Sequence, residues 1–362
     1  MLPRNVLPVF LALFPRLVHL SYDVADKNQQ EMAPWDYSML AAPSVTDLVY
    51  LRWPDLVDLA SVTDLLPRCC PRLGSLVVSC PADFQQHDIS RLMESTLACP
   101  DMQVIRFQAG SLPANDPQDE PQPNVSGLRR LVVCQQAFVN LAVMSRILRA
   151  HEQTLVEFKC DETGHFDFID VHHAPAVSLH MPALTRVQLS SSIPNVIRPF
   201  SAFLANAPGL IELVLNRMTI DDEIMTAIAR LPRLQHLTFN KCRGDTDLLS
   251  LLVRESIDKG ADCTLTSLCV RDASANMMWD EDVFIDMALI MTLHHIEVSA
   301  AVSDRRTLSS FAIRSFTENA TRSGLANHLE TLVLPVPKRN PNIRHLLSSS
   351  CQPLTSLKLI ST

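Results

Sequence analysis

The stretch L-P-R-L-Q-H-L-T-F-N-K-C, residues 231–242, decides the fold, because its pattern recurs through the whole chain of 362 residues. Three apolar residues, Leu234, Leu237 and Phe239, occupy the first, fourth and sixth places of a motif L-x-x-L-x-L, in which L stands for any apolar residue. Alternating apolar residues at the end of the motif favour a short strand with one buried face. Pro232 stops a preceding helix and extends the backbone toward the strand.

The same motif occurs thirteen times along the chain. The first places are taken by Leu17, Val45, Leu73, Met102, Leu128, Leu155, Leu184, Leu210, Leu234, Leu265, Leu293, Leu329 and Leu354. Their mean spacing is about 28 residues, which lies in the range of repeats that stack into a solenoid. One apolar triplet is weak evidence for a strand, but thirteen at one period indicate a stack of similar units.

Segments with helical spacing lie between the strand motifs. Ile224, Ile228 and Leu231 recur after the acidic pair Asp221 and Asp222, which suits the N-terminus of a helix. Similar segments are residues 56–66, 89–97, 141–148, 197–204, 248–257, 283–291, 308–316 and 343–347. The sequence therefore predicts an α/β solenoid, with about thirteen parallel strands on the concave face and helices on the convex face, as a single domain over residues 1–362.

Three segments carry a resemblance to a known family: C-P-R-L-G-S-L-V-V (residues 70–78), A-P-G-L-I-E-L-V-L (207–215) and the stretch 231–242. The chain resembles the ribonuclease-inhibitor-like leucine-rich repeats, and more closely the long arrays of fungal F-box/leucine-rich-repeat proteins. The resemblance covers nearly the whole chain and implies a horseshoe. It is specific for the fold and not for the function, because one repeat architecture serves many partners.

The resemblance implies a protein–protein interaction scaffold and, more narrowly, the substrate-recognition part of an F-box-type ubiquitin ligase, with an adaptor and a substrate as partners. The F-box itself is not visible, since only sixteen residues precede Leu17. The alternative is a regulator of an enzyme or a small GTPase that uses the same surface. The family places Asn or Cys at the ninth position, where Cys242 fits. Other residues stand there in other repeats, so irregular turns are expected: Met218, Ala273, Gln136 and Ser192.

The amino-acid composition limits the kinds of partner that the protein can bind and the cellular compartment in which it is expected. A net charge of -8 argues against binding of nucleic acid through a basic face, and no apolar run is long enough to span a membrane. The run from Val6 to Phe14 contains Pro8 and lacks a small-residue cleavage site, so it does not indicate a signal peptide. The ten cysteines are spread through the chain, which favours reduced, buried thiols. An intracellular protein, cytoplasmic or nuclear, is therefore expected.

Motifs of catalytic sites are missing from the sequence. The eight glycines are never one residue apart, which excludes G-x-G-x-x-G and Walker A loops. The sequence also lacks C-x-x-C, H-E-x-x-H and G-x-S-x-G. We therefore expect no enzyme activity and no cofactor, with an enzyme of unrecognised site as the weakest alternative.

Two irregular loops, residues 108–126 and 161–181, are expected to emerge at the same rim as binding lips, although a disordered excursion suits the first equally well. In and beside the second loop stand potential zinc ligands: Cys160, His165, Asp167, Asp170, His172, His173 and His180. Their spacing matches no closed zinc motif, so a solvated polar loop is the favoured interpretation and no metal site is assigned.

The strand motif also predicts the binding surface. Side chains alternate along a strand, so the third, fifth and seventh places of each motif face the concave side. In the middle repeats these places hold Arg106, Arg130, Glu157, Lys159, Asp161, Arg186, Gln188, Glu212, Asn216, His236 and Asn240. Val49, Leu51 and Val77 form a small apolar patch at the same places of earlier repeats. A protein partner that contacts several strands at once is expected here, against the simpler interpretation of a solvated face.

Overall fold

The structure is a computed structural model of the whole chain. It describes residues 19–23, 45–52, 70–80, 93, 96–109, 126–133, 141–161, 179–190, 200–273, 280–300, 307–336, 342–351 and 353–361. The chain forms two compact units: described residues up to Leu184 belong to unit 1, and those from Thr185 onward belong to unit 2. The expected single domain over residues 1–362 stays a prediction.

The described residues contain thirteen strands, and every strand begins at the third place of its motif. Unit 1 holds β1 (His19–Asp23), β2 (Asp47–Arg52), β3 (Ser75–Cys80), β4 (Val104–Ala109), β5 (Arg130–Val133) and β6 (Glu157–Asp161). Unit 2 holds β7 (Arg186–Ser190), β8 (Glu212–Asn216), β9 (His236–Asn240), β10 (Ser267–Ala273), β11 (His295–Ala300), β12 (Thr331–Val336) and β13 (Ser356–Ser361). The predicted repeat pattern is therefore confirmed strand by strand.

Within each unit, consecutive strands pair in parallel and in chain order. The register aligns equal places of the motif, so Leu215 of β8 lies beside Phe239 of β9, and Phe239 lies beside Val270 of β10. The same apolar row is buried, with Leu215, Phe239 and Val270 each no more than 1% exposed. Within each unit this alignment creates a continuous core, because each repeat buries its apolar row against the next.

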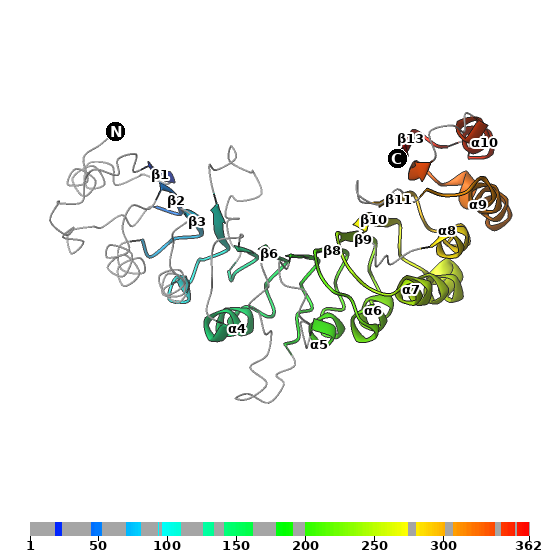
Figure 1. Cartoon of the computed structure of the whole chain (residues 1–362). Helices are drawn as coiled ribbons and strands as arrows, with labels where there is room; N and C mark the ends of the chain where they lie inside the picture. Colours follow the sequence, from blue (N-terminus) through cyan, green and yellow to red (C-terminus); the bar gives the residue numbers. More distant parts are fainter. Residues whose placement is uncertain are drawn as a thin grey trace. The chain divides into compact units, whose positions relative to one another are not determined.

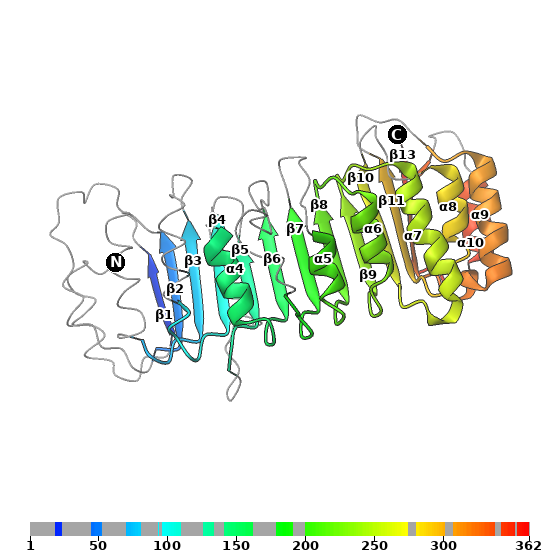
Figure 2. The same cartoon turned by 90° about the horizontal axis from the view of Figure 1, so that it is seen from below.

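Helices connect the strands. Their bounds are α4 (Leu141–Ala150) in unit 1, and α5 (Phe200–Ala205), α6 (Asp222–Ala229), α7 (Thr246–Lys259), α8 (Glu281–Met287), α9 (Ser310–Ser323) and α10 (Asn342–Ser350) in unit 2. Short 3-10 turns follow α7 at Gly260–Asp262 and α9 at Leu325–Asn327. In unit 2 the helices lie on the outer side of the bend and the strands line its inner side (Figures 1 and 2). None of the described helices has both the length and the apolar character needed to cross a membrane.

The predicted helices differ from the observed ones mainly at their ends. The prediction that a helix reaches residue 291 is wrong, because α8 ends at Met287 and the chain turns toward β11. In contrast, α9 runs seven residues beyond the predicted end at 316, to Ser323. The expected helix at 56–66 and most of the one at 89–97 lie outside the described residues.

Short polar side chains cap the N-termini of α6, α8 and α9, as the acidic pair at the start of α6 indicated, whereas Asp245 before α7 makes no such hydrogen bond. Asp221 accepts a hydrogen bond from the N–H of Ile224 at 2.9 Å. Ser309 does the same for α9, since its hydroxyl accepts the N–H of Ala312 at 3.1 Å. Glu281, in the first turn of α8, accepts both the N–H and the hydroxyl of Ser309, at 2.6 and 2.8 Å. The cap of one helix is therefore held by the neighbouring helix.

A threonine hydroxyl closes several repeats through one recurring hydrogen bond, which we call the threonine clasp. The threonine stands immediately before the first apolar place, and its hydroxyl donates to the carbonyl of the first-place residue one repeat earlier. The three pairs are Thr154 with Leu128 at 2.9 Å, Thr264 with Leu234 at 2.8 Å, and Thr292 with Leu265 at 2.6 Å. Each clasp supplies a donor for a backbone carbonyl that lies two residues before its strand begins.

The turns after β8 and β9 are alike, so the expectation of irregular turns is wrong at these places. At the eighth place of both motifs, Arg217 and Lys241 have φ of 55°. Each donates its backbone N–H to a carbonyl of the following strand, at 2.7 and 2.8 Å. At the ninth place the Cys242 thiol donates to the carbonyl of Leu215 at 3.2 Å, as expected, whereas Met218 fills the equivalent place as a buried apolar side chain.

Candidate functional site

One face of the sheet in unit 2 carries no helix among the described residues, and we call it the open face. Inward-pointing residues such as Leu213, Leu215 and Leu237 are fully buried under the helices. The third, fifth and seventh places of each motif alternate with them and therefore point to the opposite side. Seen edge-on, the labelled helices of unit 2 all lie on one side of its strands (Figure 1).

In unit 2 the predicted binding residues lie on the open face, in rows set by the register. Arg186, Glu212 and His236 form one row, and Asn216 and Asn240 belong to another. Their side chains are exposed or half-buried, as expected for a contact surface. Arg186 Nε lies 3.5 Å from Glu212 Oε2, with both side chains about half exposed at 53% and 42%. Solvent screens such a pair, which contributes on the order of 0.2–1 kcal/mol.

Gln188 of β7 is also half-buried, between the two rows already described. It is paired in register with Val214 of β8, which is paired with Thr238 of β9. A partly apolar strip thus separates the two more polar rows of the open face.

In unit 1 the equivalent places are less accessible than expected. Arg106 is only 7% exposed, and its register neighbours Val77 and Val132 are 6% and 4% exposed. Arg106 and Val77 therefore offer a partner little accessible surface, and their predicted part in binding stays a prediction. The alternation of side chains along a strand determines the side of the sheet to which a residue points. Its solvent exposure depends on the chain segments that surround it.

Two of the remaining predicted residues of unit 1, Arg130 and Glu157, form an ion pair between β5 and β6. Arg130 Nε lies 3.1 Å from Glu157 Oε2, and these side chains are only 13% and 20% exposed. Lys159, in the next row, is half-buried. Asp161 ends β6, and its side chain lies outside the described part, as do the side chains of Val49 and Leu51.

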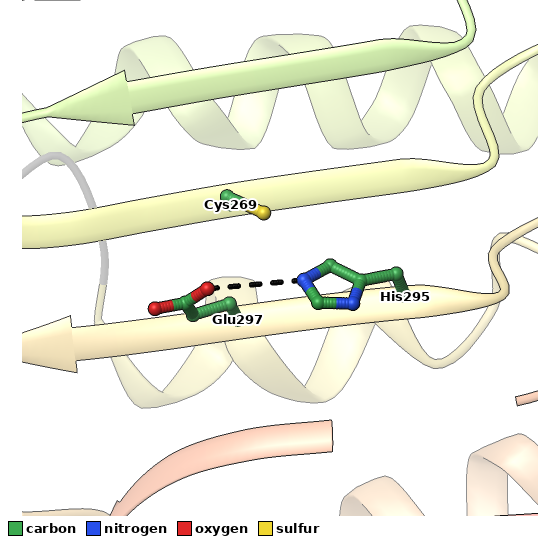
Figure 3. A group of neighbouring side chains, drawn as sticks. All are labelled: Cys269, His295 and Glu297. Carbon is green, nitrogen blue, oxygen red and sulfur yellow. Dashed lines mark ion pairs between the residues drawn. The ribbon is translucent and has the colours of Figure 1, made fainter. Parts of the chain in front are cut away.

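The sequence analysis missed a group of three side chains in unit 2. Cys269 of β10 and His295 and Glu297 of β11 offer a sulfur, a ring nitrogen and a carboxylate oxygen that all lie within 4.8 Å of one another. Figure 3 shows the three side chains gathered between the two strands. Cys269 lies directly beside Glu297 in the register. We call these three residues the Cys-His-Glu cluster.

A specific signal in the sequence marks this cluster. Cys269 and Glu297 both stand at the fifth place of their motifs, and His295 stands at the third place. In the linear sequence, His295 and Glu297 follow Cys269 by 26 and 28 residues. Aligning equal places of the repeats puts Glu297 beside Cys269, and His295 lies two places earlier on the same side of its strand. A search across repeats, rather than for short local motifs, finds them.

Neighbouring side chains hold the cluster in place. Arg271 donates from Nη2 to Glu297 Oε2 at 2.7 Å, and His295 Nε2 lies 3.8 Å from the same oxygen. Ser267 Oγ is 3.8 Å from Cys269 Sγ. Burial raises the pKa of the Cys269 thiol. Burial also lowers the pKa of His295, more than the nearby Glu297 raises it.

The other cysteine environments agree with reduced, structural thiols. The seven cysteines whose surroundings are described are all free and buried: Cys70, Cys99, Cys160, Cys242, Cys263, Cys269 and Cys351. Burial raises the pKa of Cys99 and of Cys242 to about 11. Such thiols remain protonated at neutral pH and are poor nucleophiles.

Most of the potential zinc ligands around loop 161–181 lie outside the described residues: His165, Asp167, Asp170, His172 and His173. Cys160 is 1% exposed and His180 is exposed. Residues 162–178 and most of the loop 108–126 lie outside the described part, so the expectations for both loops stay predictions.

No family model and no curated protein sequence matches the chain. Among solved structures, an internalin (inlF) from Listeria monocytogenes is 11% identical, with a TM-score of 0.44 over 97% of this chain and 84% of that chain. TLR13 in complex with ssRNA13 is 16% identical, with a TM-score of 0.48 over 95% of this chain and 43% of that chain. The Arabidopsis receptor kinase HAESA leucine-rich-repeat ectodomain is 12% identical, with a TM-score of 0.35 over 91% and 40%. The assignment of this chain to the leucine-rich-repeat fold rests on its own thirteen aligned strand motifs.

Proposed function

We propose that this chain is a protein-binding scaffold that holds its partner on the open face of unit 2. The observation that carries the proposal is the seven-stranded sheet of unit 2, one side of which is packed by helices while the described part of the other side is made by strands alone. A partner that lies on this side touches several strands at once, which suits a solenoid surface.

The chemistry of the open face favours a protein over a nucleic acid. Its arginines stand beside carboxylates, as in the pairs Arg186–Glu212 and Arg271–Glu297. Paired arginines leave no broad positive surface for phosphates, and the chain carries a net charge of -8. Arginines, amides and histidines on a rigid backbone are suited to a polar protein interface.

A matched pair of charge reversals tests the location of the surface. Arg186→Glu changes the open face, and Arg230→Glu changes an exposed residue at the C-terminus of α6. Partners are first recovered from cell extract by affinity purification and identified, and the affinity of a purified partner is then measured for each variant. We expect Arg186→Glu to weaken binding at least about tenfold with an unchanged melting temperature, because it removes an interface cation. A loss of affinity in Arg230→Glu alone would move the site to the helical side.

A narrower proposal follows from the resemblance to F-box/leucine-rich-repeat proteins: an intracellular, cytoplasmic or nuclear substrate-recognition part of a ubiquitin ligase. Size-exclusion chromatography of the chain mixed with a purified cullin adaptor tests this directly. A stable complex supports the ligase role. Failure to form one, together with capture of a small GTPase or an enzyme on the open face, would favour the regulatory alternative and leave the scaffold proposal intact.

A further inference from the structure

We propose that the Cys-His-Glu cluster, Cys269, His295 and Glu297, binds a zinc ion on the open face of unit 2. This inference concerns the chain alone and does not depend on a protein partner. It rests on three potential ligand atoms from adjacent strands that lie within 4.8 Å of one another.

The geometry requires only small side-chain movements. Two ligand atoms on one tetrahedral zinc ion lie about 3–4 Å apart, given metal–ligand distances of about 2.0–2.3 Å. The observed separations are therefore at most about 1 to 2 Å too long, which rotations of the histidine and glutamate side chains can supply. His295 Nε2 and Glu297 Oε2, at 3.8 Å, are already near this range. The strands that carry the ligands are fixed by ladder pairing on both sides, so the backbone is ordered in advance.

The ligand types and the charges match zinc. Thiolate, imidazole and carboxylate are its usual protein ligands, and three of them with one open position are typical of zinc sites that bind a further group. A thiolate and a carboxylate together neutralise the two charges of the ion. Arg271 supports this arrangement. It donates a hydrogen bond to one of the two carboxylate oxygens of Glu297, and this bond can orient the carboxylate toward a metal. A hydroxyl next to the sulfur, Ser267, can play the same part for Cys269.

The sulfur of the cluster is buried, whereas its other two ligand groups are partly exposed to solvent. Cys269 is 3% exposed, whereas the side chains of His295 and Glu297 are 30% and 17% exposed. An ion can therefore enter from the open face and meet the sulfur at the bottom of the site. The fourth position points to the solvent side, where water or an external donor can complete the coordination.

Cobalt, which replaces zinc and absorbs light when bound to a thiolate, serves as the probe. The full chain is treated with a chelator, titrated with Co²⁺ in the presence of a reductant, and then titrated with Zn²⁺. The variants form matched pairs: Cys269→Ser with Cys263→Ser, and His295→Gln with His294→Gln. Cys263 is a buried cysteine outside the cluster, and His294 is the exposed neighbour of His295. Melting temperatures establish that each variant is folded.

We expect one equivalent of Co²⁺ with a thiolate charge-transfer band in the wild type and in the two control variants, displaced by Zn²⁺. Cys269→Ser should lose the band, and His295→Gln should weaken binding at least tenfold. If Cys269→Ser fails to fold, Glu297→Gln, which changes a partly exposed side chain, takes its place with the same expected weakening. The proposal is overturned if the wild type shows no band, if the band survives in Cys269→Ser, or if the control variants lose it equally.

Discussion

Gly127 stands immediately before the first apolar place of its repeat, and its backbone has φ of +89°. A Cβ atom at this position would lie 2.8 Å from the side chain of Thr154, the residue that forms the threonine clasp with Leu128. Two separate costs therefore oppose any other residue type: a left-handed backbone conformation and a direct clash with the clasp.

We predict that Gly127→Ala destabilises unit 1 by roughly 2–4 kcal/mol, since strain and overpacking each cost about 1–2 kcal/mol or more. Gly324→Ala provides the control, because Gly324 has nearly the same φ, +88°, with no atom within 4 Å of the added Cβ. Chemical denaturation, monitored by hydrogen exchange, measures the free energy of unfolding that each variant loses. Equal losses in the two variants would mean that the clasp yields to the methyl group without cost.

At the same scale, the sequence predicted the side of the sheet that each binding residue takes but not its exposure. Arg186 and Arg106 both stand on the predicted side, yet the first is exposed and the second is buried. Period-two alternation fixes direction, whereas exposure depends on chain segments distant in sequence. The Cys-His-Glu cluster escaped prediction for a related reason: its members come together only through the pairing of different repeats.

Neighbouring helices in unit 2 are joined by polar contacts as well as by apolar packing. The rings of Phe284 in α8 and Phe316 in α9 stack with centroids 4.5 Å apart and an interplanar angle of 12°. At the N-terminal ends of the two helices, Glu281 holds the Ser309 cap of α9 through two hydrogen bonds. The carboxylate thus fixes where α9 begins, in addition to its favourable place in the first turn of α8.

We predict that Glu281→Ala lowers the free energy of unfolding of unit 2 by about 1.5–3 kcal/mol, because hydrogen bonds to a charged group are lost and the Ser309 N–H loses its acceptor. Asp282→Ala removes a carboxylate from the same helical turn without these bonds, and it should cost about 0.3–1 kcal/mol. Urea denaturation monitored by circular dichroism compares the two. A loss no larger than that of Asp282→Ala would show that water replaces Glu281 at the cap.

Helix existence was easier to predict than helix length. The apolar stripe of α8 continued in sequence to Met291, but its last residues serve the turn into β11 rather than a helix. Helix α9 continues past the predicted stripe until Gly324, whose left-handed conformation ends it. Ends are set by caps and by the direction of the next strand, which periodicity does not contain.

For the molecule as a whole, the repeat period was the strongest predictor, since each of the thirteen described strands lies in one of the thirteen motifs. The reason is physical: a repeat cannot bury its apolar row alone, so the same places must be apolar in every repeat. The variable parts of each repeat carry no such constraint, and their conformation could not be predicted from the period.

We predict that Leu213→Asp disrupts unit 2 cooperatively, at a cost of several kcal/mol, because it places a charge in a row that is fully buried. Glu212→Ala, one residue away on the open face, should change stability by less than about 1 kcal/mol, since its ion pair is exposed. Thermal melts and hydrogen exchange distinguish the two. Unchanged protection in Leu213→Asp would contradict the placement of this row in the core.

The threonine clasp has a consequence for how such a chain can change over evolutionary time. Each clasp joins the first apolar residue of a repeat to the threonine at the end of that repeat. In the three described cases the threonine stands 26, 30 and 27 positions later. The hydrogen bond joins the same two positions of the repeat each time, although the number of residues between them varies. Insertions and deletions in the outer segments therefore leave the start of the next repeat in the same place. A gene encoding this protein can therefore gain or lose codons between two clasps, or duplicate a whole repeat, without changing the strand register of the neighbouring repeats.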